Sequence, residues 1–227
     1  MPTRNRPAFF EQALRCFLRQ TYPALELIVV DDGDQAVGKL CAGVDRVRYI
    51  RLRKRTLTGT KLNIGIEAAR GRILQKLDDD DYYAPGFLET AVGHLPPRRH
   101  RVIVVWDCFL ILIAGESRLR FSGHCWRAGG TMCFRRSLWS RTPFRAVPRA
   151  VDHYLFEDSQ AEVIRVCAPE SYVLVRHGRN TWTHMGEGDT ADEFISTLPF
   201  YKKRLDQIVD PRDAAFYRSL TYAAPKK

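Results

Sequence analysis

Short apolar runs alternate with amphipathic stretches along the first half of the chain. Apolar positions recur at helical spacing from Pro7 onward, at residues 63–70, and from Pro85 to about Gly93, which predicts three helices. Short runs rich in branched apolar residues predict buried strands at residues 25–30, 47–52 and 73–77. Strands that alternate with helices indicate a parallel sheet with right-handed crossovers, and therefore an α/β fold.

The second half of the chain has a less regular pattern. Residues 102–113 predict one or two strands, residues 129–132 a loop that leads into a strand, and residues 172–176 a late strand. From Asp192 the pattern is helical and amphipathic, with Pro199 and Pro211 as breaks. No clean linker is visible, so we expect one domain with a first half at residues 1–95, a second half at 96–190 and a helical tail at 191–227.

Two acidic clusters directly follow predicted strands, the Asp31-Asp32 pair and the four aspartates at residues 78–81. In open parallel sheets, ligands bind beyond the carboxyl ends of the strands. Consecutive carboxylates repel one another, and a hard cation such as Mg²⁺ or Mn²⁺ relieves this with oxygen ligands, phosphate and water. Side chains alternate after a strand, so Asp78 and Asp80 are expected to face the ligand together. A solvated acidic turn is the alternative.

The first acidic pair and one lysine suit a nucleotide. A carboxylate at Asp31 or Asp32 can accept a hydrogen bond from a ribose hydroxyl or a base N–H, and helix capping is the alternative. Lys61 lies just before the predicted helix at residues 63–70, where a lysine beside free N–H groups suits a diphosphate. An ordinary surface lysine is equally compatible with the sequence.

The net charge of +10, from 36 Lys and Arg against 26 Asp and Glu, favours acidic partners. No nucleic-acid-binding motif is present, so no nucleic acid is expected, whereas peripheral contact with an anionic membrane is a prediction. The longest apolar stretch, residues 102–114, is interrupted by Asp107 and is too short to span a bilayer. No signal peptide precedes the first motif, so we expect a cytoplasmic protein, peripheral to the inner face of a membrane if that contact forms.

The six cysteines are scattered, and none belongs to a CxxC pair. This spacing does not indicate a structural zinc site. It favours reduced thiols, as in cytosolic proteins.

Several strings together resemble family 2 glycosyltransferases in order and spacing over residues 1–95. They lie at residues 2–7, 20–23, 26–33, 61–71 and 77–81, followed by Pro85. The resemblance implies a GT-A fold, an inverting transfer, and Mn²⁺ or Mg²⁺ as cofactor. It also implies a nucleotide-sugar donor, most often UDP-linked, and a glycan, lipid-linked or small-molecule acceptor. The chain departs from the family at its start, where most of the usual first strand is missing, and at Leu62, where arginine is usual.

Site residues follow from the resemblance position by position. It places Pro2, Thr3 and Asn5, with Asp31 or Asp32, at the nucleobase pocket. The other residues that it implies for donor binding are Lys61, Asn63, Asp78 and Asp79. Asp80 takes the favoured metal-ligand position, with Asp78 beside it. His177 is a third candidate ligand, and its alternative is a structural histidine.

An inverting transfer needs a general base for the proton of the acceptor hydroxyl. In the resembled family this base is a carboxylate in the second half, after a stretch similar to residues 129–139. Spacing after Phe144 favours Asp152, and a literal Glu-Asp match favours Asp158. We prefer Asp152.

Two other functions are compatible with parts of the sequence. A nucleotidyltransferase also uses a metal and a nucleotide fold, but the glycine-rich phosphate loop that it usually needs near the N-terminus is missing. A non-catalytic binder of nucleotide sugar or nucleic acid is the alternative from another class, and the positive charge permits it.

Overall fold

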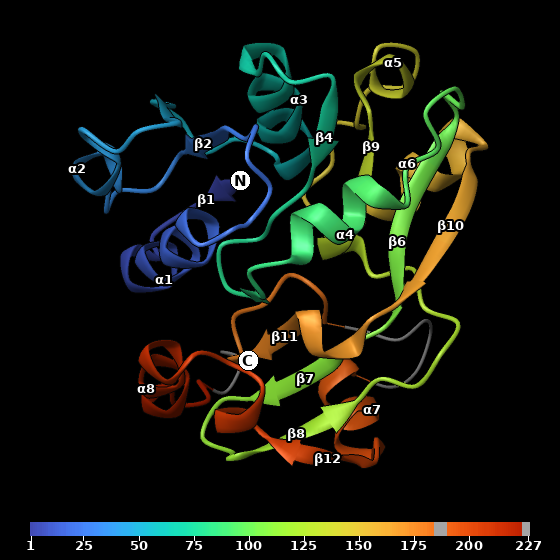
Figure 1. Cartoon of the computed structure of the whole chain (residues 1–227). Coiled ribbons are helices and arrows are strands. Elements are labelled where there is room, and N and C mark those ends of the chain that lie inside the picture. Colours follow the sequence, from blue (N-terminus) through green and yellow to red (C-terminus); the bar gives the residue numbers. More distant parts are fainter. Residues whose placement is uncertain (184–189, 224–227) are drawn as a thin grey trace.

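The computed structural model describes residues 1–183 and 190–223 (Figure 1). The strands are β1 (Pro2–Thr3), β2 (Leu27–Asp31), β3 (Val47–Arg51), β4 (Ile73–Gln75), β5 (Tyr82–Tyr83), β6 (Val102–Cys108), β7 (Leu110–Ile113), β8 (Arg118–Phe121), β9 (Cys133–Arg135), β10 (Glu162–Cys167), β11 (Tyr172–Arg176) and β12 (Phe200–Arg204). The helices are α1 (Pro7–Leu18), α2 (Gly38–Cys41), α3 (Thr58–Ala68), α4 (Phe87–Gly93), α5 (Arg136–Trp139), α6 (Val151–Ser159), α7 (Ala191–Thr197) and α8 (Pro211–Ser219). Short 3₁₀ turns lie at Gly129–Thr131, Pro169–Ser171 and Leu205–Gln207. The predicted α/β class is confirmed.

The N-terminal sheet is parallel throughout and has the order β1-β2-β3. All five residues of β2 are buried, as expected for a strand that is covered on both faces. Helix α1 begins at Pro7, as predicted, and buries Phe10, Leu14 and Phe17 on one face. Helix α3 begins at Thr58, earlier than predicted, so Lys61 lies inside the helix rather than before it.

Strand β4 differs from the expectation of a further parallel strand. It pairs antiparallel with β9, in a second sheet with the order β10-β6-β9-β4. The two residues of β1 reach only Val30 and Asp31 of β2, and a cavity of about 1110 Å³ separates β2 from β4. Met1, Ile28 and Leu74 are among the residues that line this cavity. Strands β2 and β4 therefore belong to separate sheets.

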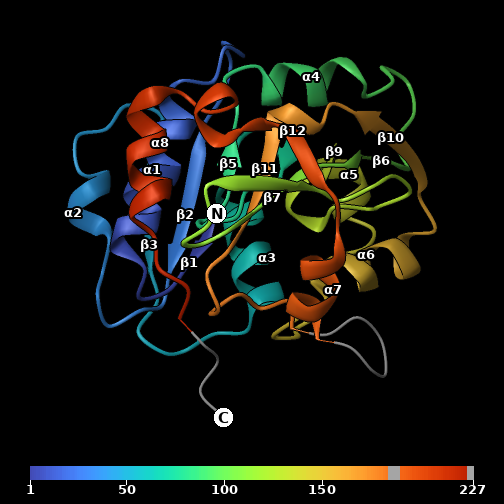
Figure 2. The ribbon, with the colours of Figure 1, turned by 90° about the horizontal axis from the view of Figure 1, so that it is seen from below.

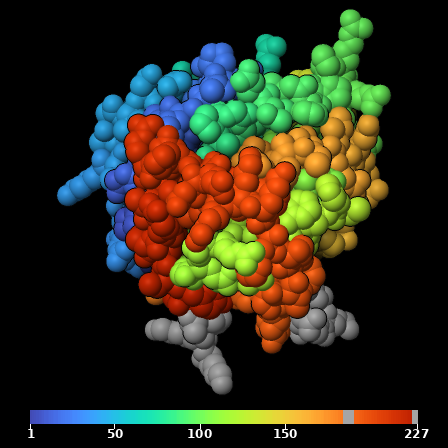
Figure 3. All heavy atoms as spheres, turned by 60° about the horizontal axis from the view of Figure 1, so that its bottom comes forward, coloured from blue at the N-terminus to red at the C-terminus, as the bar shows by residue number. Residues whose placement is uncertain are grey.

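The third sheet has the order β12-β8-β7-β11-β5, and only its β7–β11 pair is parallel. Strand β12 lies between α7 and α8 and pairs with β8, so a strand interrupts the predicted helical tail. Helix α8 lies beside α1 (Figure 2), where Gln12 and Arg19 bond to the fully buried carboxylate of Asp213. In Figure 3 the red and orange C-terminal residues cover one face, from the blue N-terminal elements to the lime-green β7–β8 region.

The tail is therefore packed onto both halves of the chain. The division at residues 95 and 190 stays a prediction. No helix in the described ranges is long and apolar enough to cross a membrane.

Candidate functional site

The four aspartates after β4 have different sets of partners, although Asp79 and Asp80 share Arg6, and Asp81 faces the interior. Its buried carboxylate accepts hydrogen bonds from the Tyr172 hydroxyl at 2.6 Å and the Val175 backbone N–H at 2.9 Å. Burial, together with the charges of Asp80 and Asp78, raises the pKa of Asp81. This residue therefore ties the acidic loop to β11 and does not face a ligand.

Asp78 pairs with a buried lysine. Lys76 Nζ lies 2.6 Å from both carboxylate oxygens of Asp78. Burial lowers the pKa of Lys76, but the charge of Asp78 and the more distant charge of Asp152 raise it above its ordinary value. We did not single out Lys76 from the sequence, although its spacing of two from Asp78 along an extended segment was a usable signal.

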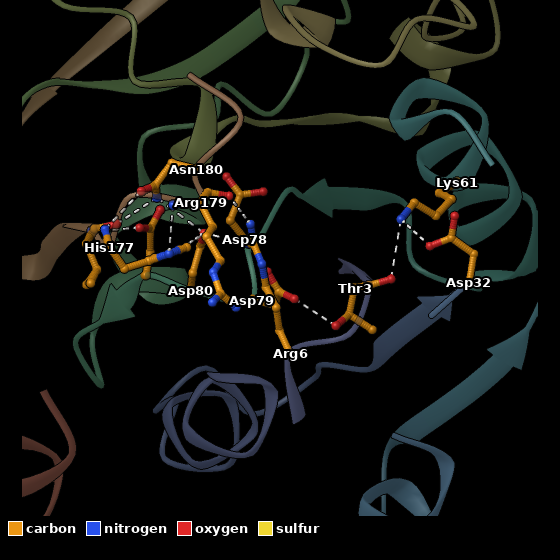
Figure 4. Close-up of polar contacts among 12 residues, drawn as sticks. Thr3, Arg6, Asp32, Lys61, Asp78, Asp79, Asp80, His177, Arg179 and Asn180 are labelled. Atoms are coloured by element: carbon orange, nitrogen blue, oxygen red, sulfur yellow. Dashed lines mark hydrogen bonds and ion pairs between the residues drawn. The ribbon is translucent and has the colours of Figure 1, made fainter. Parts of the chain in front are cut away.

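Asp79 points toward β1. Its carboxylate accepts a hydrogen bond from Thr3 Oγ1 at 2.7 Å and one from Arg6 at 3.2 Å (Figure 4). Burial is the main cause that raises the pKa of Asp79 to about 6, and the charge of Asp80 adds to it against the opposing charge of Arg6. Thr3 and Asp79 were both predicted to bind the donor, and the structure brings them together.

Asp80 points the other way, toward the loop after β11. Its Oδ2 atom lies 2.7 Å from the Arg6 guanidinium, 3.0 Å from His177 Nε2 and 3.4 Å from Asn180 Nδ2. Burial would raise its pKa, but the hydrogen bond from His177 and the charge of Arg6 lower it. Arg6 and Asn180 escaped the sequence analysis because both are far from Asp80 in the chain.

His177 is buried and is fixed from three sides. Its backbone N–H donates to Asn180 Oδ1 at 3.0 Å, and its ring lies 4.6 Å, centre to centre, from that of Phe9. The Arg179 backbone N–H lies 3.3 Å from Nδ1, which makes Nδ1 the acceptor and leaves the ring proton on Nε2, facing Asp80. The predicted pair of His177 and Asp80 is therefore in direct contact.

Lys61 links the two acidic clusters. Its Nζ atom lies 2.8 Å from Asp32 Oδ1 and 3.3 Å from the Thr3 carbonyl oxygen. Burial would raise the pKa of Asp32, but the hydrogen bonds from Lys61 and from the Thr56 backbone N–H lower it. Figure 4 shows the result, a row of polar contacts that runs from Asp32 to His177.

Three other predicted donor-binding residues have partners within the protein. Asp31 accepts hydrogen bonds from the N–H groups of Gly33 and Val37, at 2.8 and 3.0 Å, and so fixes the loop after β2. Asn5, in the left-handed region at φ 53°, accepts from the Gln35 N–H through its side chain. Pro2 lies in β1.

Asn63 likewise joins α3 to the segment after α5. Its side-chain oxygen accepts from Trp139 Nε1 and from the Phe144 N–H, and its amide donates to the Phe144 carbonyl. Donor binding by these residues stays a prediction.

The structure separates the two candidate bases. Asp152, on α6, lies against Gly129, and Asp78 lies close to Gly130, so the two carboxylates flank adjacent glycines. Asp158 instead forms an exposed ion pair with Arg145, at 2.8 and 2.5 Å. The spacing that favoured Asp152 therefore selected the carboxylate that lies beside the acidic loop.

Asp80 and His177 fit a hard divalent cation. Their facing oxygen and nitrogen atoms are 3.0 Å apart, which matches adjacent ligands about 2.1 Å from one ion in octahedral geometry. A carboxylate and an imidazole are ligands that Mn²⁺ accepts, and a diphosphate with water commonly completes such a shell. To hold a cation through Nε2, the imidazole would carry its ring proton on Nδ1 instead, where the Arg179 N–H now donates.

Known proteins resemble part of the chain in sequence. The sequence profile of glycosyl transferase family 2 matches residues 1–120. A Campylobacter jejuni protein, GalNAc(5)-diNAcBac-PP-undecaprenol beta-1,3-glucosyltransferase, is 34% identical over 97 residues, which cover 40% of this chain and 31% of the relative. The chain spans only part of the curated relatives that it matches, from 16% to 40% of their lengths.

Solved structures resemble the chain over more of its length. S. aureus TarS 1-349 in complex with UDP-GlcNAc aligns with a TM-score of 0.59 and 16% identity, covering 79% of this chain and 58% of TarS. The mannosyltransferase PcManGT from Pyrobaculum calidifontis, in complex with GDP-Man and Mn²⁺, aligns with a TM-score of 0.57 and 18% identity, covering 82% of this chain and 56% of PcManGT. These alignments show the predicted GT-A fold.

Proposed function

The chain belongs to glycosyl transferase family 2, and on that premise we propose that it transfers a sugar from a nucleotide-diphosphate donor to an acceptor hydroxyl. We further propose a UDP-linked donor, dependence on Mn²⁺ or Mg²⁺, and inversion at the anomeric carbon. One observation carries the proposal: Asp152 and Asp78 lie against the adjacent glycines Gly129 and Gly130. A candidate base and the acidic loop therefore face one site.

The row of polar contacts supplies the donor side of this site. Arg6 and Lys61 are two of the cations in the row, and both suit a diphosphate. Asp80 and His177 would hold the divalent cation, which when bound neutralises charge on the leaving diphosphate. Thr3 and Asp32 would lie on the nucleoside side of the row, next to Lys61.

Asp152 supplies the acceptor side. Its carboxylate takes the proton of the acceptor hydroxyl, and the acceptor oxygen forms a bond to the anomeric carbon. The bond between that carbon and the phosphate oxygen breaks at the same time, and the nucleoside diphosphate leaves with the electron pair. Attack from the face opposite the leaving group inverts the configuration. Lys76 stabilises the neighbouring negative charge of Asp78 and Asp152.

The acceptor is proposed only by class, as a glycan, a lipid-linked glycan or a small molecule. The Campylobacter relative is named for an undecaprenol-linked substrate, which supports the lipid-linked alternative. The charge of +10 suits an anionic membrane surface, so we propose a peripheral contact there. Sedimentation with anionic and with neutral liposomes tests this contact, and equal recovery in both pellets rejects it.

Calorimetric titration with UDP, with and without Mn²⁺, tests the donor site. We expect metal-dependent binding that is lost in Asp80→Asn and kept in Asp206→Asn, whose carboxylate forms an exposed ion pair with Arg218. GDP and dTDP are titrated in parallel to identify the base. Failure of all three nucleotides to bind contradicts the proposed donor site.

Turnover then separates the proposed enzyme from the alternatives. Release of UDP from a UDP-sugar in the presence of acceptor supports glycosyl transfer. Release of pyrophosphate from a nucleoside triphosphate would indicate a nucleotidyltransferase instead. Tight binding without turnover across a panel of acceptors favours a degenerate, non-catalytic protein.

A further inference from the structure

A second group of metal-ligating side chains lies where β6 and β10 end, and it shares no residue with the acidic loop. Asp107, Cys108, His124 and Cys167 each offer one ligand atom, and the four atoms all lie within 4.8 Å of one another. The residues come from three separate segments, which explains why the cysteine spacing did not indicate a metal site.

A β-bulge brings Asp107 and Cys108 to the same place. Val166 of β10 pairs with Trp106 of β6, but the next residue, Cys167, pairs with Cys108. Asp107 is therefore the extra residue on β6, opposite no partner of its own. In a regular strand, consecutive side chains point to opposite faces, whereas a bulge re-aims them. The bulge thus turns two consecutive residues into neighbouring ligands.

The third segment is the tight turn after β8, which carries His124. Gly123 and Cys125, on either side of the histidine, have φ of 77° and 73°, in the left-handed region. Such a conformation is costly for Cys125 and persists only where the surroundings enforce it. The Trp126 backbone N–H donates to the Asp107 carbonyl at 2.9 Å, which holds the turn against the bulge.

Two of the six distances between ligand atoms suit tetrahedral coordination. The two sulfur atoms of Cys108 and Cys167 are 3.4 Å apart, and His124 Nδ1 is 3.4 Å from Asp107 Oδ2. Ligand atoms about 2.0 to 2.3 Å from one tetrahedral ion are about 3.3 to 3.8 Å apart. Two of the four positions are exposed, those of His124 and Cys167, so an ion can reach the group from solvent.

One carboxylate oxygen of Asp107 is buried and lacks a hydrogen-bond partner in the described part of the chain. Asp107 Oδ2 faces His124, whereas the other oxygen of this carboxylate, Oδ1, is buried without a hydrogen-bond partner among the described residues. A buried carboxylate oxygen is costly unless a donor or a cation satisfies it. Two thiolates with an imidazole and a carboxylate form a soft, mixed donor set, which suits Zn²⁺ rather than Mg²⁺ or Mn²⁺. We propose that Asp107, Cys108, His124 and Cys167 form a structural Zn²⁺ site.

The position of the site gives it a structural role. Strand β6 leads into β7, and β10 leads through a 3₁₀ turn into β11, so two of the three chain crossings from the second sheet to the third pass this point. The other crossing, from β4 to β5, runs through the acidic loop. The turn with His124 continues to Gly129 and Gly130, and on the way Ala128 N–H bonds to the Trp106 carbonyl at 3.2 Å. The ion therefore joins the two sheets and anchors the segment that lies against Asp152.

Metal content measured by plasma mass spectrometry, on protein purified under reducing conditions with added Zn²⁺ and without chelator, tests the site. We expect about one zinc per chain in the wild type, and loss of that zinc in Cys167→Ser and in His124→Gln. His124→Gln changes an exposed side chain, so it keeps the test valid if Cys167→Ser does not fold. The matched control is Cys125→Ser, an exposed cysteine of the same turn that is outside the group, and it keeps the zinc.

Substitution with Co²⁺ distinguishes this site from the acidic loop. Thiolate ligands give Co²⁺ an intense charge-transfer absorption in the near ultraviolet, and no cysteine belongs to the row from Asp32 to His177. We expect this band in the wild type and in Asp80→Asn, and its loss in Cys167→Ser. Zinc retained in Cys167→Ser and His124→Gln, absence of the band in the wild type, or a Cys108–Cys167 disulfide in zinc-free reduced protein overturns the proposal.

Discussion

The carboxylate of Asp152 lies directly against Gly129, so closely that a Cβ atom added to the glycine would overlap Oδ2. A Cβ atom added to the next residue, Gly130, would lie 3.1 Å from Asp78 Oδ2. Because neither glycine has a side chain, an α6 carboxylate can approach the acidic loop at this point. Any side chain at Gly129 has to displace the candidate base.

Gly129→Ala is expected to move the Asp152 carboxylate while the fold persists. Because a displacement of about 1 Å costs on the order of 100-fold in rate, we expect kcat to fall by about that factor. Donor binding depends on the other side of the site, so the affinity for UDP should stay unchanged. Gly93→Ala is the control, since a Cβ atom there meets nothing within 4 Å. An equal loss of activity in both variants contradicts this role of Gly129.

Asp152→Asn and Asp158→Asn separate the two candidate bases. Loss of a general base typically costs about 100- to 10,000-fold in rate, and we expect that loss in kcat for Asp152→Asn only. Asp158→Asn removes an exposed ion pair with Arg145 and should leave kcat nearly unchanged. Steady-state kinetics with saturating donor measures both variants. The reverse result would identify Asp158 as the base, in agreement with the literal Glu-Asp match of the sequence.

His177→Ala is expected to weaken the binding of Mn²⁺ in the presence of UDP. The variant removes one of the two facing ligands, so we expect a loss of affinity of at least about 10-fold. His153→Ala is the matched control, because His153 is exposed and pairs only with Glu157 across one helical turn. Calorimetry with Mn²⁺ on the UDP complex measures both. Equal affinity in the two variants shows that His177 does not hold the ion.

Local pattern predicted much of this site. The strand ends located both acidic clusters. The preference for Asp152 over Asp158 came from the family resemblance, and it stays a prediction. Local pattern did not predict the contacts between segments that are distant in the sequence. Arg6 meets Asp79 and Asp80 across more than 70 residues, and nothing in its own neighbourhood indicates that contact.

The same limit applies to strand pairing. Apolar pattern identified β4 as a strand, but it did not identify the antiparallel partner β9, which lies in the second half of the chain. Asn63 shows a related limit, because a motif position gave it a role in donor binding while its side chain joins α3 to the Phe144 segment. The sequence predicted that β4 is a strand and that Asn63 lies in a family motif. It did not predict which segments β4 and Asn63 contact.

Asp213→Ala should release the contact between α8 and α1. The fully buried carboxylate of Asp213 accepts a hydrogen bond from Gln12 and pairs with Arg19, so its removal leaves two donors without their partner. Arg19 is partly exposed, which moderates the cost, and we expect a loss of about 2 to 4 kcal/mol in the free energy of unfolding. Asp206→Ala breaks an exposed pair with Arg218 and should cost less than about 0.5 kcal/mol. Chemical denaturation compares the two, and hydrogen exchange should show faster opening of α8 in Asp213→Ala alone. Similar losses in both variants would mean that the tail is held by apolar packing rather than by this buried pair.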